Sequence, residues 1–434
     1  MALSTQPYKG ARDFYPSDMR LRNYMFNTMR QVARSYGYEE YDAPVMEPIE
    51  LYKAKTGDEI VNEQTYTFED RGGRQVALRP EMTPTVSRLV AAKRQELGYP
   101  LRLFNIGPRW RYERQQRGRY REFFQCDIDI FGVETVDAEL ELIQLADKIM
   151  KSFGAKHSMY VIKLNSRQFI NFFLADYLGL DEVQQTSVAK LVDRMNKLPE
   201  SEFVAQLDAL CTPTQREDGT VERLLAVLNA ADMDALPEEL KHHETLRQLQ
   251  QVVEVLHGAG VDNVEFDSSL MRGFDYYTGI VFEVFDLHPD NNRSMFGGGR
   301  YDGLVGLFGV EPVPTVGFAM GDATLANFLE VHDLVPQLDS DVQLYVAVTG
   351  DVLQEAQKAV AELREEGVNV AVDISGKKLD KQLKTADKKG IPYVIVIGQQ
   401  ELASGQYSLK NLKTGEAETH SLARIASLLQ DSRN

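Results

Sequence analysis

Cysteine, tryptophan and long apolar runs are scarce in this sequence. Two of its 434 residues are cysteines and one is tryptophan. Cys126 and Cys211 cannot form a disulfide framework, and neither belongs to a CxxC or Cys/His ligand pattern, so we assign no side chain to a metal. No apolar stretch approaches the ~18 residues of a membrane-spanning helix. These absences exclude a disulfide scaffold, a structural zinc module and a membrane protein.

Positive charge is also in deficit. The chain has 48 Lys and Arg against 65 Asp and Glu, a net charge of -17, which argues against indiscriminate nucleic-acid binding. The first residues show neither a signal-peptide nor a transit-peptide pattern, so we expect a cytoplasmic protein. With 43% hydrophobic residues, the length predicts a globular chain of about three domains.

Apolar spacing predicts mixed helices and strands before residue 335. A period of about 3.6 over residues 17–36 predicts an amphipathic helix, and residues 101–106 and 123–131 read as the strands of a long hairpin. From 166 to 258 the pattern is nearly all helical. We therefore expect an α+β core in two parts, 1–165 and 259–334, interrupted by a helical insertion at 166–258.

The last part of the chain has a different pattern. After an acidic, proline-containing linker at 335–342, strands alternate with helices, which is typical of parallel βαβ units. Residues 343–434 contain 12 basic and 12 acidic side chains, so the 36 basic and 53 acidic residues before them carry the whole deficit of 17. We expect 343–434 to form a separate small α/β domain with a partner of its own.

Arginines are concentrated on the predicted hairpin. Residues 102–121 contain seven arginines and one acid, Glu113, in a chain that is acidic overall. Arginine suits bidentate phosphate contacts, so the cluster indicates a polyanionic ligand. A solvated basic loop is the alternative.

The second hairpin strand carries polar residues at alternate positions. Gln125, Asp127 and Asp129 fall on one face, and Cys126 and Ile128 on the other. Burying two carboxylates and an amide without partners is costly, which favours a ligand site on this face. A solvent-facing sheet surface would produce the same alternation.

Two further features are weaker by themselves. Glycines flank Arg272 and the paired Tyr276 and Tyr277, and a glycine-dense stretch spans 296–303, but neither fits a phosphate-binding fingerprint. In the tail, lysines recur at helical spacing, consistent with nucleic-acid contact or with an ordinary solvated face. These are Lys377, Lys381, Lys384 and Lys388.

Together these motifs resemble class II aminoacyl-tRNA synthetases, and specifically the histidyl-tRNA synthetase family. Residues 36–44 match class II motif 1, and 109–123 match motif 2. Two histidine-specific signatures match 272–277 (RGFDYY) and 298–303 (GGRYDG). The tail is similar to the family's anticodon-binding domain, so the resemblance covers nearly the whole chain.

The resemblance implies a fold, a reaction and a set of roles. An antiparallel sheet flanked by helices would hold the active site, the insertion would grip the tRNA acceptor arm, and motif 1 would build a homodimer. ATP with Mg²⁺, L-histidine and tRNA(His) would be the reactants. Arg111 and Arg272 would be the catalytic cations on the ATP α-phosphate, Glu113 would bind the adenine edge, and Arg119 would meet ATP or the tRNA end. The implied histidine-binding residues are Glu81, Thr83, Gln125, Asp129, Arg272, Tyr276, Tyr277 and Tyr301.

One position departs from the family pattern. Family motif 3 ends Gly-x-x-x-Gly-x-Glu-Arg, and its arginine grips the ATP γ-phosphate, whereas here Thr324 stands in that place. Our hypothesis is that the hairpin arginines Arg114, Arg117 and Arg119 substitute for it.

Three functions compete at this point. The first is ligation of histidine to tRNA(His) through a histidyl-adenylate. The second is a catalytically silent paralogue that senses histidine as a regulatory subunit of ATP phosphoribosyltransferase, which the missing arginine favours. The third is a non-enzymatic nucleic-acid-binding module, which accounts for the arginines and lysines but not for the polar strand face.

Overall fold

The computed structural model describes residues 3–53, 64–114, 118–195, 198–271, 276–291 and 293–431. The chain divides into two compact units, Met1–Asp13 with Asn23–Val335, and Phe14–Arg22 with Pro336–Asn434. In the described ranges, no helix is both long and apolar enough to cross a lipid bilayer.

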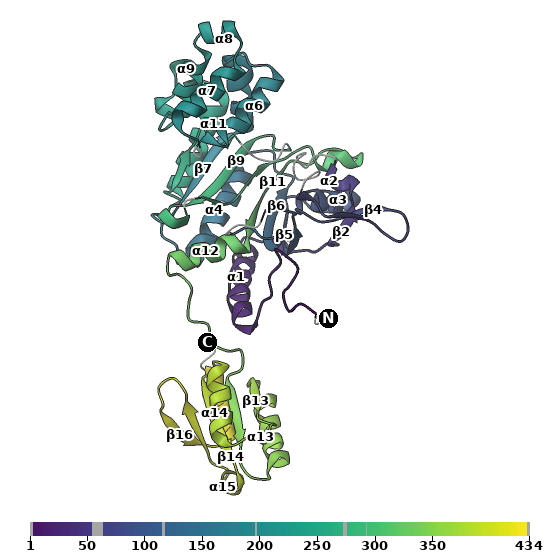
Figure 1. The fold of residues 1–434 in the computed structure, drawn as a ribbon, viewed down its shortest axis with the longest axis vertical. Coiled ribbons are helices and arrows are strands. Elements are labelled where there is room, and N and C mark those ends of the chain that lie inside the picture. The colour runs from purple at the N-terminus through teal and green to yellow at the C-terminus, as the bar shows by residue number, and fades with distance from the viewer. Residues whose placement is uncertain are drawn as a thin grey trace. The chain divides into compact units, whose positions relative to one another are not determined.

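An eight-stranded sheet forms the centre of the larger unit (Figure 1). Its neighbouring strands are antiparallel except for the first and last pairs, which are parallel. The expected α+β architecture is therefore confirmed. In spatial order the strands are β1 (Glu39–Glu40), β5 (Leu101–Trp110), β6 (Glu122–Phe131), β11 (Thr315–Gly321), β10 (Ser294–Arg300), β9 (Ile280–Asp286), β7 (Tyr160–Ser166) and β8 (Val264–Phe266).

Helices cover one face of this sheet because its apolar side chains point there. Cys126 and Ile128 of β6 are fully buried on that face, as the alternation predicted. Helix α4 (Asp137–Ser152) packs there with its own buried apolar stripe, and α12 (Asp322–Val331) contacts β6, β10 and β11. The predicted N-terminal helix is α1 (Pro16–Ser35).

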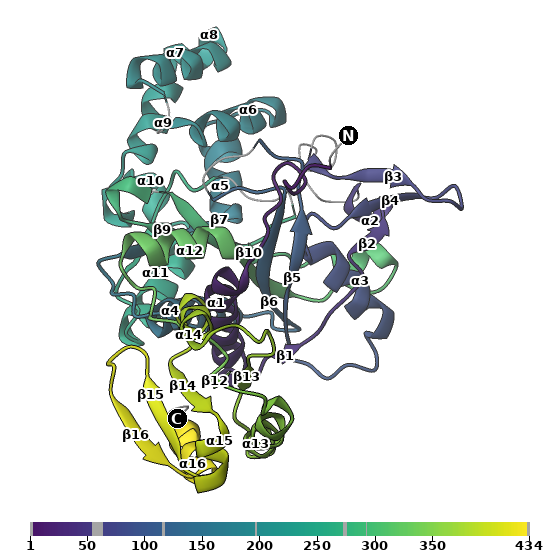
Figure 2. The same ribbon diagram turned by 60° about the horizontal axis from the view of Figure 1, so that its bottom comes forward.

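A smaller sheet lies beside the hairpin in the same unit (Figure 2). Strands β2 (Met46–Pro48), β4 (Gln75–Leu78) and β3 (Thr67–Glu69) pair antiparallel in that order. Two helices accompany them, α2 (Glu50–Lys53) and α3 (Thr83–Lys93). The sequence analysis made no prediction for this sheet, whose strands are too short to show a period.

The insertion between β7 and β8 is helical, as expected. The spacing of apolar residues over 238–257 predicts one long helix, which is wrong in detail, because His243 caps a new helix and divides the run in two. The Thr–Pro pair at 212–213 predicts a break in the helices, and the break is present, where Thr212 forms a capping box. The helices are α5 (Arg167–Asn171), the π-helical turn η2 (Phe172–Tyr177), α6 (Glu182–Val192), α7 (Glu200–Leu210), α8 (Pro213–Glu217), α9 (Thr220–Leu228), the 3₁₀ turn η4 (Met233–Ala235), α10 (Glu238–Lys241) and α11 (Glu244–Gly258).

The smaller unit has a five-stranded mixed sheet. The predicted parallel strands are confirmed, but the sequence analysis missed an antiparallel pair at one edge, visible in Figure 2. Three lysines of the predicted stripe, Lys381, Lys384 and Lys388, lie on α14, whereas Lys377 precedes the helix. The strands are β13 (Val370–Val372), β12 (Leu344–Val348), β14 (Tyr393–Ile397), β15 (Tyr407–Asn411) and β16 (Ala417–His420), and the helices are α13 (Leu353–Glu365), α14 (Leu379–Lys388), α15 (Gln399–Ser404) and α16 (Leu422–Asp431).

A buried ion pair ties β10 to α4 in the larger unit. The Arg300 guanidinium donates to both carboxylate oxygens of Glu139, at 2.7 and 2.6 Å. It also donates to the carbonyl oxygens of Val133 and Thr135, each at 2.9 Å. Glu139 is 1% exposed. All these contacts hold the end of β10, where the next residue is Tyr301.

We predict that Glu139→Gln lowers the free energy of unfolding of the larger unit by about 3–5 kcal/mol, because it leaves a buried guanidinium without its counter-charge. Urea denaturation followed by circular dichroism measures this. The control is Glu141→Gln, which removes the more exposed ion pair with Arg102 (2.7 Å) and should cost about 1 kcal/mol or less. Equal losses in the two variants would contradict the prediction.

Candidate active site

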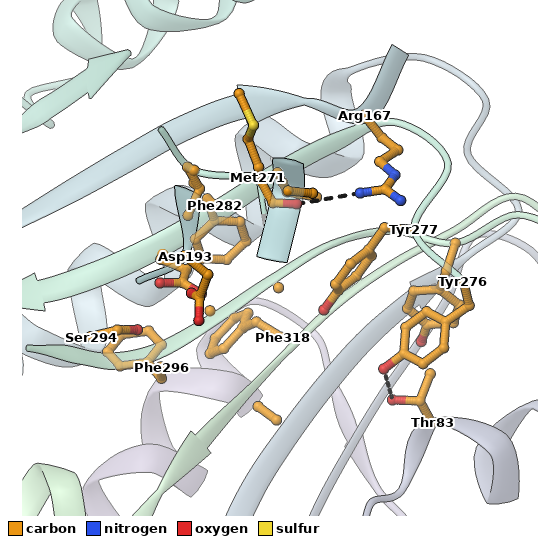
Figure 3. A pocket seen from close by; sticks show the side chains of 18 of the residues that line it. Thr83, Arg167, Asp193, Met271, Tyr276, Tyr277, Phe282, Ser294, Phe296 and Phe318 are labelled. Carbon is orange, nitrogen blue, oxygen red and sulfur yellow. Dashed lines mark hydrogen bonds between the residues drawn. The ribbon is translucent and has the colours of Figure 1, made fainter. Parts of the chain in front are cut away.

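A cavity of about 1490 Å³ opens over the face of the large sheet opposite its helices. Strands β6, β9, β10 and β11 supply its floor, and the start of α3 and helices α5 and α6 supply its walls. Figure 3 shows Thr83, Tyr276 and Tyr277 towards one end, and Ser294 and Phe296 towards the other. The site residues implied by the resemblance that line this cavity are Glu81, Thr83, Arg111, Arg119, Gln125, Asp129, Tyr276, Tyr277 and Tyr301.

Strand β6 presents its three polar side chains to this cavity. Gln125, Asp127 and Asp129 all line it, which confirms the predicted alternation. Asp127 is already satisfied, because the fully buried Arg109 donates to its carboxylate at 2.6 Å. Gln125 and Asp129 are different. The Oε1 atom of Gln125 and the Oδ2 atom of Asp129 are buried and accept no hydrogen bond from any described residue.

Asp129 is a buried acceptor in the cavity. Its side chain is 3% exposed, and the Tyr301 hydroxyl donates to Oδ1 at 2.5 Å. Burial raises the pKa of Asp129 to about 8, although the bond from Tyr301 favours the ionised form. The second oxygen, Oδ2, accepts no hydrogen bond from any described residue. In the ionised form of Asp129 this oxygen suits a ligand N–H group, and a cationic ligand would favour that form.

Small residues make room for this carboxylate. On β11, Gly317 is the register partner of Asp129, and a Cβ added to Gly317 would overlap the carboxylate. On β10, a Cβ on Gly298 would overlap the carbonyl oxygen of Gly317. The glycine-dense stretch therefore forms a flat floor rather than a phosphate loop.

The aromatic end of the cavity holds a second polar group. The Tyr276 hydroxyl donates to Glu81 Oε2 at 3.0 Å and lies 3.5 Å from Thr83 Oγ1. Burial, followed by the charge of Glu81, raises the pKa of Tyr276 well above its ordinary value. The Tyr277 ring packs 5.0 Å from the Tyr276 ring. The Glu81 carboxylate and the Thr83 hydroxyl at this end, with the Gln125 oxygen that also lines the cavity, are acceptors suited to an ammonium group.

Arginines lie next to this end along the hairpin. Arg111 donates through Nε to the carbonyl oxygen of Pro80 at 2.9 Å, and its guanidinium lies 5.4 Å from the Phe123 ring centre. Glu113 stands beside two cations, 3.9 Å from Arg111 and 3.4 Å from Arg119. Two predicted cations, Arg272 and Arg117, lie outside the described residues. Arg111 and Arg119 together supply positive charge for an anionic ligand.

The arginine-rich stretch was only partly a ligand signal. Arg102 forms a bidentate pair with Glu141, and Arg109 is the buried partner of Asp127. Arg121 stacks 3.9 Å from the Tyr112 ring centre. These three serve the fold. Composition could not separate them from Arg111 and Arg119, because the partners of these three, Glu141, Asp127 and the Tyr112 ring, are set by the folded structure.

Several charged residues that line the cavity were not predicted from sequence. Glu283 comes from β9, and Arg167, Lys190, Asp193 and Arg194 come from the first helices of the insertion. Arg167 is fixed by donating to the Met271 carbonyl oxygen at 3.3 Å (Figure 3). A charged residue directly after a buried strand, as Arg167 is after β7, was the one available signal.

We predict that Asp129→Asn raises the free energy of unfolding of the ligand-free protein relative to the parent, by an amount that increases with pH. Asp129 has a pKa of about 8 when folded and about 3.9 when unfolded, so its favourable contribution is complete at low pH. That contribution is lost as pH rises towards 8, at up to about 1.4 kcal/mol per unit. Asparagine avoids this loss. Urea unfolding from pH 4 to 9 should show a stability difference that widens up to pH 8 and then levels. A difference independent of pH would contradict the raised pKa.

Comparisons with known proteins agree with this geometry. The family profile described as "Histidyl-tRNA synthetase" matches residues 10–325, and the profile described as "Anticodon binding domain" matches residues 343–432. The histidine–tRNA ligase of Leptospira biflexa serovar Patoc is 42% identical over 434 residues, covering 99% of this chain and 98% of the relative. That of Halobacterium salinarum is 38% identical over 420 residues, covering 96% and 95%.

A solved structure gives the same answer. The crystal structure of histidyl-tRNA synthetase from Nostoc sp. PCC 7120 superposes with a TM-score of 0.82 at 26% identity, covering 99% of this chain and 100% of that one. The similarity therefore extends through both units and through the linker between them. On the profile matches and on the near full-length identity to these relatives, the chain belongs to the histidyl-tRNA synthetase family.

Proposed function

We propose that this chain ligates L-histidine to tRNA(His) in two steps. The histidine carboxylate attacks the α-phosphorus of ATP, pyrophosphate leaves, and the histidyl-adenylate then transfers its acyl group to the 3′ end of the tRNA. The observation that carries the proposal is a pair of buried acceptors, Gln125 Oε1 and Asp129 Oδ2, that no described residue satisfies, in a cavity that Arg111 also lines. The names of the relatives, histidine–tRNA ligase, support the same reaction.

The histidine side chain would bind at the deep end of the cavity. An imidazole N–H would donate to Asp129 Oδ2, with Tyr277 beside the ring and Tyr301 holding the carboxylate. The α-ammonium group would bind Glu81, Thr83 and Gln125. A site built around a buried hydrogen bond rejects amino acids of similar shape that lack the donor, because the acceptor would stay unpaired.

ATP would bind along the hairpin. Arg111, and Arg272 from the histidine-specific signature, would hold the α-phosphate and stabilise the charge that develops as the carboxylate attacks. Glu113 would bind the adenine edge. Arg119, which is 59% exposed in its side chain, would reach the outer phosphates or the tRNA end.

Magnesium would accompany ATP as the nucleotide complex. Mg²⁺ usually takes one or two carboxylates together with phosphate oxygens and water, and Glu283 lines the cavity on its sheet floor. That carboxylate fits the ion. Bound there, the ion would neutralise phosphate charge while Arg111 keeps the α-phosphate in place.

The regulatory alternative is not favoured. A histidine sensor has no need of an anticodon-binding domain, and residues 343–432 match one. The relatives at 38–42% identity are named as ligases. A purely nucleic-acid-binding role leaves the acceptors of β6 without a ligand.

We further propose a homodimer that works in the cytoplasm. The small sheet exposes apolar side chains, with Met46 47% exposed, Phe68 45% and Val45 36%. A patch of this kind favours a protein partner, here a second copy joined through motif 1. Light scattering coupled to gel filtration would give about twice the 49.1 kDa mass of one chain.

We predict ATP–pyrophosphate exchange that depends on histidine and on no other amino acid. The assay needs no tRNA, and charging of tRNA(His) by the same preparation tests the second step. Asp129→Ala should lower kcat/KM for histidine by about 100-fold, the scale of a lost hydrogen bond to a charged group. Histidine binding without exchange would instead support the sensor.

A separate prediction concerns Arg119. If the hairpin compensates for Thr324, Arg119→Ala should raise the KM for ATP about tenfold while leaving the KM for histidine nearly unchanged, because only the phosphates lose a contact. The exchange assay at varied ATP measures this. An unchanged KM for ATP would remove Arg119 from the compensating set.

A further inference from the structure

Thr324 cannot supply the cation that the family pattern has at its position. It lies in the first turn of α12, and its hydroxyl is within hydrogen-bonding distance of the Met295 and Gly321 carbonyl oxygens, at 3.0 and 3.1 Å. A threonine fixed to neighbouring backbone brings no positive charge. If the outer phosphates of ATP bind beside Thr324, another residue has to supply a cationic side chain there.

A guanidinium from a different element reaches that space. Arg293 directly precedes β10. Its Nη1 atom lies 3.4 Å from the point where a Cβ on Gly118 would stand, and the same point is 3.0 Å from Asn327 Nδ2 and 3.7 Å from Thr324 Cγ2. Three elements therefore converge at one point: the hairpin turn before Arg119, the start of β10 and the first turns of α12.

The orientation of Arg293 is built into the fold. Its Nε donates to Asn291 Oδ1 at 3.0 Å, and Asn291 Nδ2 donates to Asp286 Oδ2 at 2.6 Å. Asp286 is fully buried, and His332 Nε2 lies 2.8 Å from its other oxygen. The backbone N–H of Asp286 donates to the Arg293 carbonyl oxygen at 3.1 Å. These contacts hold the backbone and the Nε atom of Arg293, and Nη1 lies near Gly118.

The second donor at this point is the side-chain amide of Asn327. Asn327 Nδ2 is buried and makes no hydrogen bond to any described residue. An unsatisfied buried donor is costly, and a ligand oxygen between it and the Arg293 guanidinium would satisfy it. Ser294 and Met295, the next residues after Arg293, line the active-site cavity. A guanidinium with an adjacent amide suits a phosphate oxygen.

We propose that Arg293, assisted by Asn327, binds the outer phosphates of ATP in place of the arginine absent at position 324. This inference rests on the proposed ligase function. The cation would come from the residue directly before β10, the strand that packs against α12, and the hydrogen bond to Asn291 orients it. Arg111 would then hold the α-phosphate and Arg293 the leaving pyrophosphate.

The test is ATP–pyrophosphate exchange with Arg293→Ala and Arg293→Lys at saturating histidine. Losing a charged hydrogen bond to phosphate should raise the KM for ATP and for pyrophosphate about 10- to 100-fold in Arg293→Ala. Arg293→Lys should recover part of the loss, because it keeps the charge but not the planar fork. Asn327→Ala should raise the KM for ATP several-fold. The KM for histidine should stay nearly constant in all three.

The histidyl sulfamoyl-adenosine analogue separates phosphate binding from structural damage. It mimics the adenylate and lacks the outer phosphates, so calorimetry should give parental affinity in Arg293→Ala. The matched control is Arg216→Ala, an arginine of the insertion paired with Asp208 at 3.3 Å, which should leave both KM values unchanged.

Two results would overturn the proposal. One is a KM for ATP within twofold of the parent in Arg293→Ala, and the other is equal loss of affinity for ATP and for the analogue. Failure of the parent protein itself to exchange with histidine would refute the proposed function instead, so the two failures are distinguishable.

Discussion

The active site depends on one buried carboxylate, Asp129, whose hydrogen bonding within the described part of the chain is incomplete. Tyr301 donates to one of its oxygens, and no described residue donates to the other. A buried acceptor without a donor is unfavourable in a ligand-free protein and is tolerated where a ligand completes it. The surroundings follow from this requirement. Gly317 and Gly298 leave space for the carboxylate, and the Arg300–Glu139 pair fixes the strand end that carries Tyr301. Burying Asp129 lowers the stability of the ligand-free protein. The contacts around it stabilise the site and keep its second oxygen facing the cavity.

The cations of the chain divide into two groups by what faces them. Arg109 and Arg300 are buried against carboxylates, where removing either partner would strand a charge. Arg111 and Arg119 line the cavity, next to a single shared acid, Glu113. This arrangement lets a protein with a net charge of -17 present a local positive field to a nucleotide, since field strength near a ligand depends on the nearest charges and not on the sum.

Local periodicity allowed much of the core to be predicted from sequence. The features that could not be predicted depend on partners that are distant in the sequence. The alternation of Gln125, Asp127 and Asp129 is a property of one strand, so it could be read from sequence, as could α1 and the hairpin. The use of Asp127 by Arg109 depends on the pairing register of β5 and β6, which spacing does not fix. The motif resemblance identified Tyr301 and Glu81 across more than 200 residues, where no periodicity could have joined them.

Arg293 illustrates why motif loss and functional loss are different things. A motif records the chain position of a side chain, whereas a phosphate responds to where the charge lies in space. Thr324 and Arg293 are 31 positions apart in the sequence, yet both flank the same point beside Gly118. Because α12 packs on β10, a cation lost from one element can be replaced from the other with no change of fold. The replacement needs its own orientation, and Asn291 with the buried Asp286 supplies it. An arginine before β10 in place of one on α12 therefore still has to be held in a fixed position. The residues that hold it are different ones.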